Sequence, residues 1–162
     1  MRKALVATVV LLVGLSFLTI GAVAQVATAN LSVQITITAG CLLQNVNNIN
    51  FGPHALLSSN VDATGSFEVL CTSGVPYTVS LDGGGGGSIN SRRMESGGEQ
   101  VSYQLYSDPA RLQIWGETLG VDRVSGTGSG VAQSLTIYGR VPSQTTPPAG
   151  TYTDTVTITL NY

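Results

Sequence analysis

The 162-residue chain carries few charges: 10% of its residues are charged, and the formal net charge is −2. It lacks the basic footprint with which proteins displace counterions from phosphates, so we expect no nucleic-acid partner. The low charge and the 20 glycines favour an all-β extracytoplasmic domain over a helical or disordered chain. The length allows one domain with a hydrophobic core.

Residues 1–24 are typical of a secretory signal peptide. Two basic residues precede an uncharged apolar run, which ends in a small-x-small cleavage box at residues 22–24. We predict cleavage before Gln25 and export through the inner membrane to the periplasm, and a cut after Ala29 remains open. The alternative is an uncleaved membrane anchor, because no charge occurs in residues 4–24.

Residues 30–38, directly behind this leader, alternate strictly between apolar and polar side chains. A strand with this pattern presents a polar row on one face and an aliphatic row on the other. The aliphatic row consists of Leu31, Val33, Ile35 and Ile37.

Cys41 and Cys71 are the only cysteines. An exported chain with an even cysteine count usually pairs them, so we predict a disulfide between these two residues. A redox or metal role is disfavoured because the two cysteines form no CxxC motif and His54 is the only histidine. We expect no metal or other cofactor.

Short alternating segments separated by turn residues recur along the rest of the chain, without a sustained helical period. A tight turn at Ser73-Gly74 separates the second and third of these segments. The expected inward rows include Phe67, Val69 and Cys71 in one segment, Tyr77, Val79 and Leu81 in another, and Val131, Leu135, Ile137 and Val141 in a third. The segments span residues 49–53, 65–71, 75–84, 101–108, 111–117, 130–141 and 150–162.

This spacing, with glycine and proline turns and one disulfide, favours an immunoglobulin-like β-sandwich. A jelly roll or a small barrel is the alternative architecture.

The last segment has the clearest half-buried pattern, with threonines on its outer face. Its predicted inward residues are Tyr152, Val156, Ile158, Leu160 and Tyr162. Both this segment and residues 30–38 are apolar strands with nothing in the sequence to cover an edge. Long apolar edges aggregate unless a partner fills them, so strand addition between chains would satisfy both segments.

Catalytic motifs are weak in this sequence, and we expect no enzymatic activity. His54 has no nucleophile elbow near it. The glycine run at residues 83–87 is interpreted as a mobile hairpin tip, and Arg92-Arg93 as a solvated turn or, alternatively, a partner contact. Trp115 is more typical of a core residue than of a sugar-stacking platform.

Several stretches together resemble the spore coat protein U domain family, which includes subunits of archaic (Csu-type) chaperone-usher pili. They lie in the family's order and cover most of the chain after the leader. The stretches are TAGC, INFG, EVLCTSGVPYTVSLDGG, VSYQLYSDPAR and LTIYGRVPSQTTPPAGTYTDTVTITLNY.

The resemblance implies an immunoglobulin-like fold that lacks one strand. A periplasmic chaperone lends a strand, and an outer-membrane usher exchanges it for the N-terminal extension of a neighbouring subunit. Residues 1–24 would then be the signal peptide, residues 25–40 the donor extension and residues 41–162 the sandwich domain. The donor side chains would be Leu31, Val33, Ile35 and Ile37, lying beside the strand from Tyr152 to Tyr162 of a neighbour.

The resemblance implies a structural subunit of a surface fibre that supports adhesion and biofilm formation. A spore-coat protein is the first alternative. The second is a secreted carbohydrate-binding sandwich that uses Trp115 and exposed tyrosines.

Overall fold

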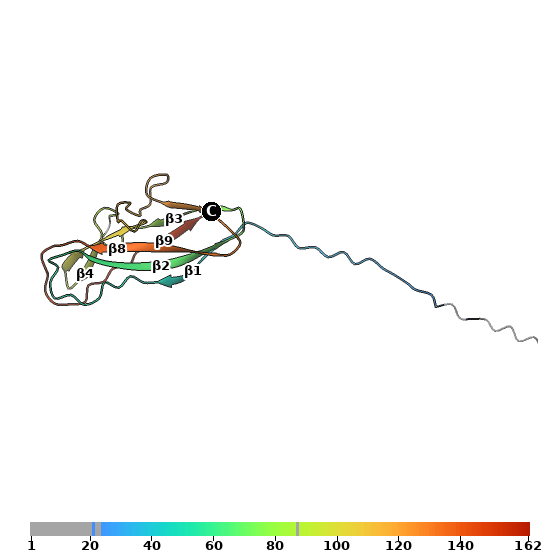
Figure 1. Ribbon diagram of the computed structural model, residues 1–162, viewed down its shortest axis with the longest axis horizontal. Helices are drawn as coiled ribbons and strands as arrows, with labels where there is room; N and C mark the ends of the chain where they lie inside the picture. Colours follow the sequence, from blue (N-terminus) through green and yellow to red (C-terminus); the bar gives the residue numbers. More distant parts are fainter. Residues whose placement is uncertain (1–20, 22–23, 87) are drawn as a thin grey trace, which may run out of the picture. The chain divides into compact units, whose positions relative to one another are not determined.

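The computed structural model describes residues 21, 24–86 and 88–162 (Figure 1). The predicted signal peptide lies almost entirely outside these residues. The chain divides into two units, Met1–Ile35 and Thr36–Tyr162. The described part of the first unit has no regular secondary structure, whereas the second contains nine strands and, within the ranges described, no helix.

The first sheet is built around two long antiparallel strands, β2 (Val61–Cys71) and β8 (Ala132–Val141), which lie side by side in Figure 1. β1 (Cys41–Asn47) pairs with the outer side of β2, and β6 (Gln104–Tyr106) with the outer side of β8. The sheet order is therefore β1-β2-β8-β6. Phe67, Val69 and Cys71 are buried on one face of β2, as their alternation predicts.

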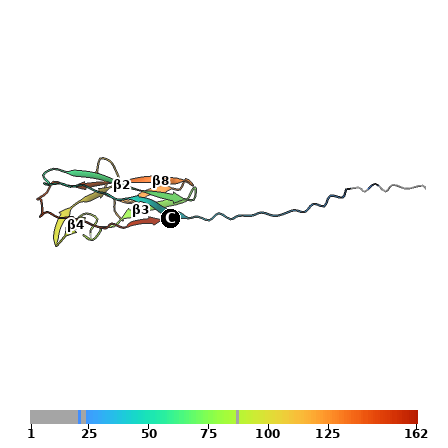
Figure 2. The same cartoon turned by 90° about the horizontal axis from the view of Figure 1, so that it is seen from below.

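The second sheet has the order β7-β3-β9, with β7 at Val124–Thr127, β3 at Pro76–Leu81 and β9 at Ile158–Asn161. Figure 2 shows the two sheets as separate layers, and the core lies between them. Tyr77, Val79 and Leu81 of β3 point into this core, as predicted. A separate hairpin joins β4 (Arg93–Ser96) to β5 (Glu99–Ser102) through Gly97 and Gly98, which both have positive φ.

Trp115 ties the two layers together at the centre of the core. Its ring lies 5.8 Å from that of Phe67, and its Nε1 donates a hydrogen bond to the carbonyl oxygen of Val79 at 2.9 Å. The side chain is only 1% exposed. The prediction of a core role for Trp115 is confirmed, and a carbohydrate platform built on this residue is excluded.

The prediction of a solvated turn at Arg92 is wrong, because this side chain is completely buried. Its guanidinium donates to the carbonyl oxygens of Leu81, Asp82 and Trp115 and to Oε1 of Gln104, at 2.6–3.1 Å. A planar group with five donors can satisfy several carbonyls at once. Arg92 therefore joins the end of β3 to residues of β6 and of the Trp115 segment.

Residues 83–86 of the glycine run are also not the free hairpin tip that the sequence suggests, and Gly87 lies outside the described residues. The backbone N–H of Gly85 donates to Oδ1 of Asp154 at 2.7 Å, and that of Gly84 to Oδ1 of Asp82 at 3.0 Å. A Cβ on Gly84 would collide with the carboxylate of Asp154, and φ there is +67°. The glycines allow the chain to wrap closely around that carboxylate.

Several strand assignments differ from the sequence-based expectation. Residues 49–53 form no strand, residues 101–108 divide between β5 and β6, and residues 111–117 contribute one isolated bridge between Ile114 and Tyr106. β1, β4 and β7 were not predicted. Val131 is exposed rather than inward, while the Ser73-Gly74 turn is confirmed by a hydrogen bond from Val75 N to Thr72 O.

Candidate functional site: an open groove beside the last strand

β9 has a free edge. Its residues pair with β3 on one side, from Thr78↔Asn161 to Leu81↔Ile158, and β9 ends the order of its sheet. The preceding residues have few backbone bonds: an isolated bridge joins Thr153 to Glu95, and Asp82 N donates to the carbonyl oxygen of Thr157. Thr157 N donates instead to a side chain, at Oδ1 of Asp82. A row of backbone N–H and C=O groups therefore remains available for another strand.

A groove of about 1010 Å³ opens beside this segment. One wall comes from the end of β1 and the chain that follows it, within residues 46–57. The other comes from the chain that precedes β9 and the first residue of β9, within residues 146–158. The floor consists of core side chains from both sheets and from β5 and β6, among them Leu81, Val101, Leu105, Ile137 and Val141. The groove is therefore a slot into the hydrophobic core and not a polar surface cleft.

Two glycines of the first sheet position the wall that follows β1. A Cβ on Gly139 would lie 2.9 Å from Cζ of Phe51, and a Cβ on Gly65 would lie 2.7 Å from Cγ1 of Ile49. Because these positions lack a side chain, Ile49 and Phe51 pack closely against β8 and β2. The alternation in INFG correctly indicated inward side chains, although no strand forms there.

Three of the five predicted acceptor residues line the groove: Tyr152, Val156 and Ile158. Leu160 packs against the core without lining the groove. Tyr162 is 65% exposed and lines a different hollow, near the disulfide, so the expectation that it points inward is wrong. The inward and outward alternation holds from Tyr152 to Asn161.

The predicted donor side chains are uncovered. Leu31, Val33, Ile35 and Ile37 are between 71% and 87% exposed, and residues 24–40 adopt no regular secondary structure. Exposing several large aliphatic side chains in one row is unfavourable in water, at about 1.5–3 kcal/mol for each relative to full burial. This segment has the composition of a core strand but, in this chain alone, no core around it.

Asp154 holds the rim of the groove. Its Oδ2 accepts a 2.6 Å hydrogen bond from the hydroxyl of Tyr103, and its Oδ1 accepts the bond from Gly85. Burial, together with this hydrogen bond to the carboxylate, raises the pKa of Tyr103 well above its usual value. The phenol therefore stays protonated and keeps donating to Asp154.

His54 lies on the groove wall, and its Nε2 donates to the carbonyl oxygen of Phe51 at 2.8 Å. This contact is with the backbone and identifies no catalytic partner. Across the described residues, no group of three or more His, Cys, Asp or Glu side chains has a metal-binding arrangement. Nor does this part of the chain contain a helix long and apolar enough to cross a membrane.

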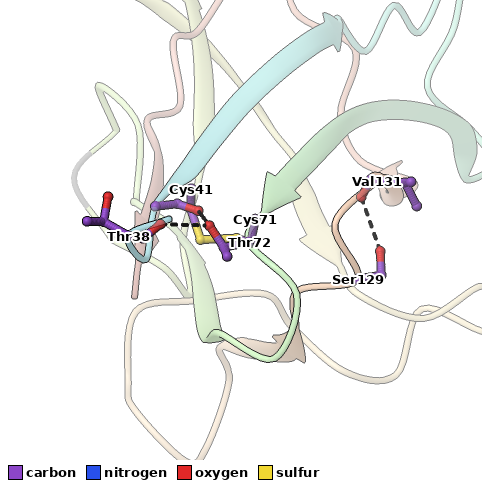
Figure 3. The surroundings of a disulfide bond; sticks show 7 residues. Thr38, Cys41, Cys71, Thr72, Ser129 and Val131 are labelled. Atoms are coloured by element: carbon purple, nitrogen blue, oxygen red, sulfur yellow. Dashed lines mark hydrogen bonds between the residues drawn. A yellow bond between two sulfur atoms is a disulfide. The ribbon is translucent and has the colours of Figure 1, made fainter. Parts of the chain in front are cut away.

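The predicted disulfide is confirmed: Cys41 and Cys71 are bonded and face each other across β1 and β2 (Figure 3). Next to it, the hydroxyl of Thr72 donates to the carbonyl oxygen of Thr38 at 3.2 Å. The bond joins the edge strand β1 to the central strand β2, at the point where the chain enters the sandwich.

Comparisons with known proteins agree with this geometry. The family model of the Spore Coat Protein U domain matches residues 27–159. Protein U of Myxococcus xanthus is 30% identical over 156 residues, which cover 86% of this chain and 87% of Protein U.

A similar solved structure is that of the CsuC-CsuE chaperone-tip adhesion subunit pre-assembly complex from archaic chaperone-usher Csu pili of Acinetobacter baumannii. Its TM-score is 0.57 at 27% identity, over 78% of this chain and 40% of the solved chain. The present chain thus spans less than half the length of that solved chain. The all-β architecture and the family resemblance inferred from the sequence are confirmed, and the chain belongs to the Spore Coat Protein U domain family.

Proposed function

We propose that this protein is a structural subunit of a surface fibre that assembles by donor-strand exchange. Residues 25–40 of one copy form the donor extension, and its alternating strand lies in the groove of the next copy, beside the segment from Tyr152 to Tyr162. Leu31, Val33, Ile35 and Ile37 enter the groove as the side chains that complete its core. The remaining residues, 41–162, form the sandwich domain, and residues 1–24 are a signal peptide.

The observation that carries this proposal is the match between an open slot and an uncovered strand. The groove exposes core residues next to the free edge of β9, and the donor segment presents aliphatic side chains at every second position. Strand addition supplies both a backbone ladder and alternate side-chain pockets.

Three free-energy contributions decide how tightly the donor strand binds. Burial of four large aliphatic side chains contributes about 6–12 kcal/mol before costs. Each added backbone hydrogen bond contributes about 0.5–1.5 kcal/mol. The opposing cost is about 1–2 kcal/mol for each residue that becomes ordered. A preformed groove lowers this cost, and Asp154, Gly65 and Gly139 hold its walls in place.

The similarity to a chaperone-subunit complex of Csu pili supports the same partners for this protein. They are a periplasmic chaperone that fills the groove before assembly, an outer-membrane usher and neighbouring subunits. The protein is exported to the periplasm and ends in a cell-surface fibre that supports adhesion and biofilm formation. We assign it no enzymatic activity.

A double substitution tests the donor assignment. In the mature chain, Val33→Asp with Ile35→Asp places two charges into the groove and should abolish assembly, because a buried unpaired carboxylate is strongly unfavourable. Ser32→Asp with Gln34→Asp adds the same charges to the other face of the strand and should assemble as the wild type does. Size-exclusion chromatography and electron microscopy measure the assembly.

The two double variants also show which result would contradict the donor assignment. If the Val33/Ile35 variant formed fibres as readily as the Ser32/Gln34 variant, the donor assignment would be wrong. If both assembled poorly, charge on the segment would matter but not its alternation, and the predicted register would fail.

The family's name supports a coat protein as a second candidate, built by the same strand exchange. Immunogold labelling of intact cells separates the two locations: fibres projecting from the surface support a pilus subunit, and a continuous shell supports a coat.

A further inference from the structure

A second hollow lies at the disulfide end of the domain, away from the groove residues. Its volume is about 610 Å³. Both cysteines of the Cys41–Cys71 bond line it, together with Thr72, which Figure 3 shows next to the bond. It contains no charged side chain; its lining residues are Ile37, Gly40, Cys41, Leu42, Leu70, Cys71, Thr72, Ser73, Gly130 and Tyr162.

Exposed apolar side chains cluster at this hollow. Leu42 is 62% exposed, Tyr162 65% and Val131 65%, and each is large. Val131 follows Gly130, whose N–H donates to the carbonyl oxygen of Cys71. We define the disulfide-end patch as Ile37, Leu42, Leu70, Val131 and Tyr162. Exposed apolar side chains gathered around one hollow mark an interaction site more often than isolated ones do.

Residues 38–41, where the N-terminal segment joins the domain, are bonded to the sandwich beside this patch. Thr72 donates through its hydroxyl to the carbonyl oxygen of Thr38 and through its N–H to that of Gly40, at 3.2 and 2.9 Å. The disulfide holds Cys41 directly after these bonds. Thr38 is therefore attached to the sandwich, and Ile37, the last predicted donor side chain, is its immediate neighbour.

This attachment leaves almost no linker between donor segment and domain. One residue spans at most about 3.3–3.6 Å, so the groove that receives Ile37 must come within about 13 Å of Cys41. Any copy that takes up the donor segment is thereby brought against the disulfide-end patch. This step rests on the proposed function.

We propose that the disulfide-end patch is a second interaction surface for the copy whose groove holds residues 25–37. The contact covers Leu42, Val131 and Tyr162 when the donor strand is in place. It adds apolar area to the strand interface and fixes the angle between successive copies. A fibre with this contact dissociates more slowly than the donor strand alone would allow, because interface contacts act mainly on the dissociation rate.

Charges placed in the patch test this contact in the full mature chain. Leu42→Glu and Val131→Glu, made separately, should each speed dissociation of assembled chains by about tenfold or more, as loss of an interface anchor does. The matched control is Leu119→Glu, since Leu119 is 68% exposed, lines neither hollow and, unlike Val131, has no sequence neighbour that does. Dissociation is followed by size-exclusion chromatography after dilution into a fixed urea concentration.

A peptide of residues 25–38 separates this proposal from the donor-strand proposal. It is added to mature chains that carry Val33→Asp and Ile35→Asp, with and without each patch substitution. The peptide should raise their melting temperature equally, because the patch lies outside the groove. An equal rise also shows that the patch variants are folded.

The outcomes are distinct. The patch proposal is wrong if the patch variants dissociate at the same rate as the wild type and Leu119→Glu while the peptide still binds. Strand exchange would remain supported by that result. A patch substitution that lowers the melting temperature of the non-assembling chain also overturns it, because the patch is then covered within one molecule. Wild-type chains that neither assemble nor respond to the peptide overturn both proposals.

Discussion

Arg92 has a structural role that its sequence context does not predict. It follows a turn and precedes another arginine, a pattern typical of a solvated pair. Instead, its guanidinium is enclosed by the carbonyl oxygens of Leu81, Asp82 and Trp115. Burial lowers the pKa of Arg92, while the charges of neighbouring acidic groups oppose this. The group satisfies carbonyls that would otherwise be buried without a donor.

Substitution of Arg92 by lysine tests this role. A lysine keeps the charge but loses the planar fork, so several carbonyls lose their donor. We expect the free energy of unfolding to fall by about 2–3 kcal/mol, as measured by urea denaturation of the non-assembling Val33→Asp, Ile35→Asp chain. Arg93→Lys is the control and should change it by less than about 0.5 kcal/mol, because the half-buried Arg93 donates through Nη1 to the exposed side chain of Gln100, a bond that a lysine can also make. Equal effects would contradict a special role for Arg92.

At the scale of elements, the segment before β9 is extended although little of it belongs to a strand ladder. Besides the backbone bonds to Thr153 and Thr157, two carboxylates hold this segment. Oδ1 of Asp82 accepts the N–H groups of Thr157 and Gly84 at 2.9 and 3.0 Å, and Asp154 accepts that of Gly85. The groove wall is thus held by side chains from outside the sheet, and its backbone edge stays open.

Asp82 makes this wall sensitive to acid. Burial by itself would raise the pKa of Asp82, but hydrogen bonds from Thr157 and Gly84 and the charge of Arg92 outweigh it and hold the pKa below its ordinary value of 3.8. Because the native pKa is lowered, the stabilisation is complete well above pH 3.8 and is lost as the pH falls through the lower native value.

We therefore expect Asp82→Asn to reduce the loss of thermal stability on acidification below this range. Melting curves between neutral and strongly acidic pH, recorded on the non-assembling chain, measure it. Glu99→Gln is a suitable control, since Glu99 is an exposed residue of β5. If the melting temperature of Asp82→Asn fell with pH as steeply as that of the unsubstituted chain, Asp82 would not be the cause of the acid sensitivity.

At the scale of the whole molecule, the domain holds two sheets together although one side of its core is open. Trp115 and Arg92 bond to both layers, and the disulfide secures the edge strand β1 to β2. These contacts explain how a sandwich with an unfilled groove keeps its walls in place.

Removal of the disulfide should lower global stability. Cys41 and Cys71 are 30 residues apart, and a cross-link of that span stabilises by about 3–4 kcal/mol by restricting the unfolded chain. We expect the double substitution Cys41→Ser and Cys71→Ser to lower the free energy of unfolding by about this amount in urea. The wild type measured under a thiol reductant should match it. If the midpoint of urea denaturation did not change, the disulfide would contribute nothing to the stability of the domain.

Features that depend on local pattern were predictable from the amino-acid sequence. Two cysteines in an exported chain predicted their pairing, and alternation predicted the buried faces of β2, β3 and the segment from Tyr152 to Leu160. The resemblance of several stretches indicated the family. Each of these follows from residue type and a period of two along the chain.

Features that depend on contacts between distant residues became visible in the folded structure alone. Arg92 is buried because backbone carbonyls from two segments and the side chain of Gln104 converge on it. Gly85 is held because Asp154 lies beside it. Residues 49–53 line a groove without forming a strand, because Gly65 and Gly139 leave space for Ile49 and Phe51. Such placements depend on what packs against a residue from elsewhere in the chain, and local sequence carries no record of it.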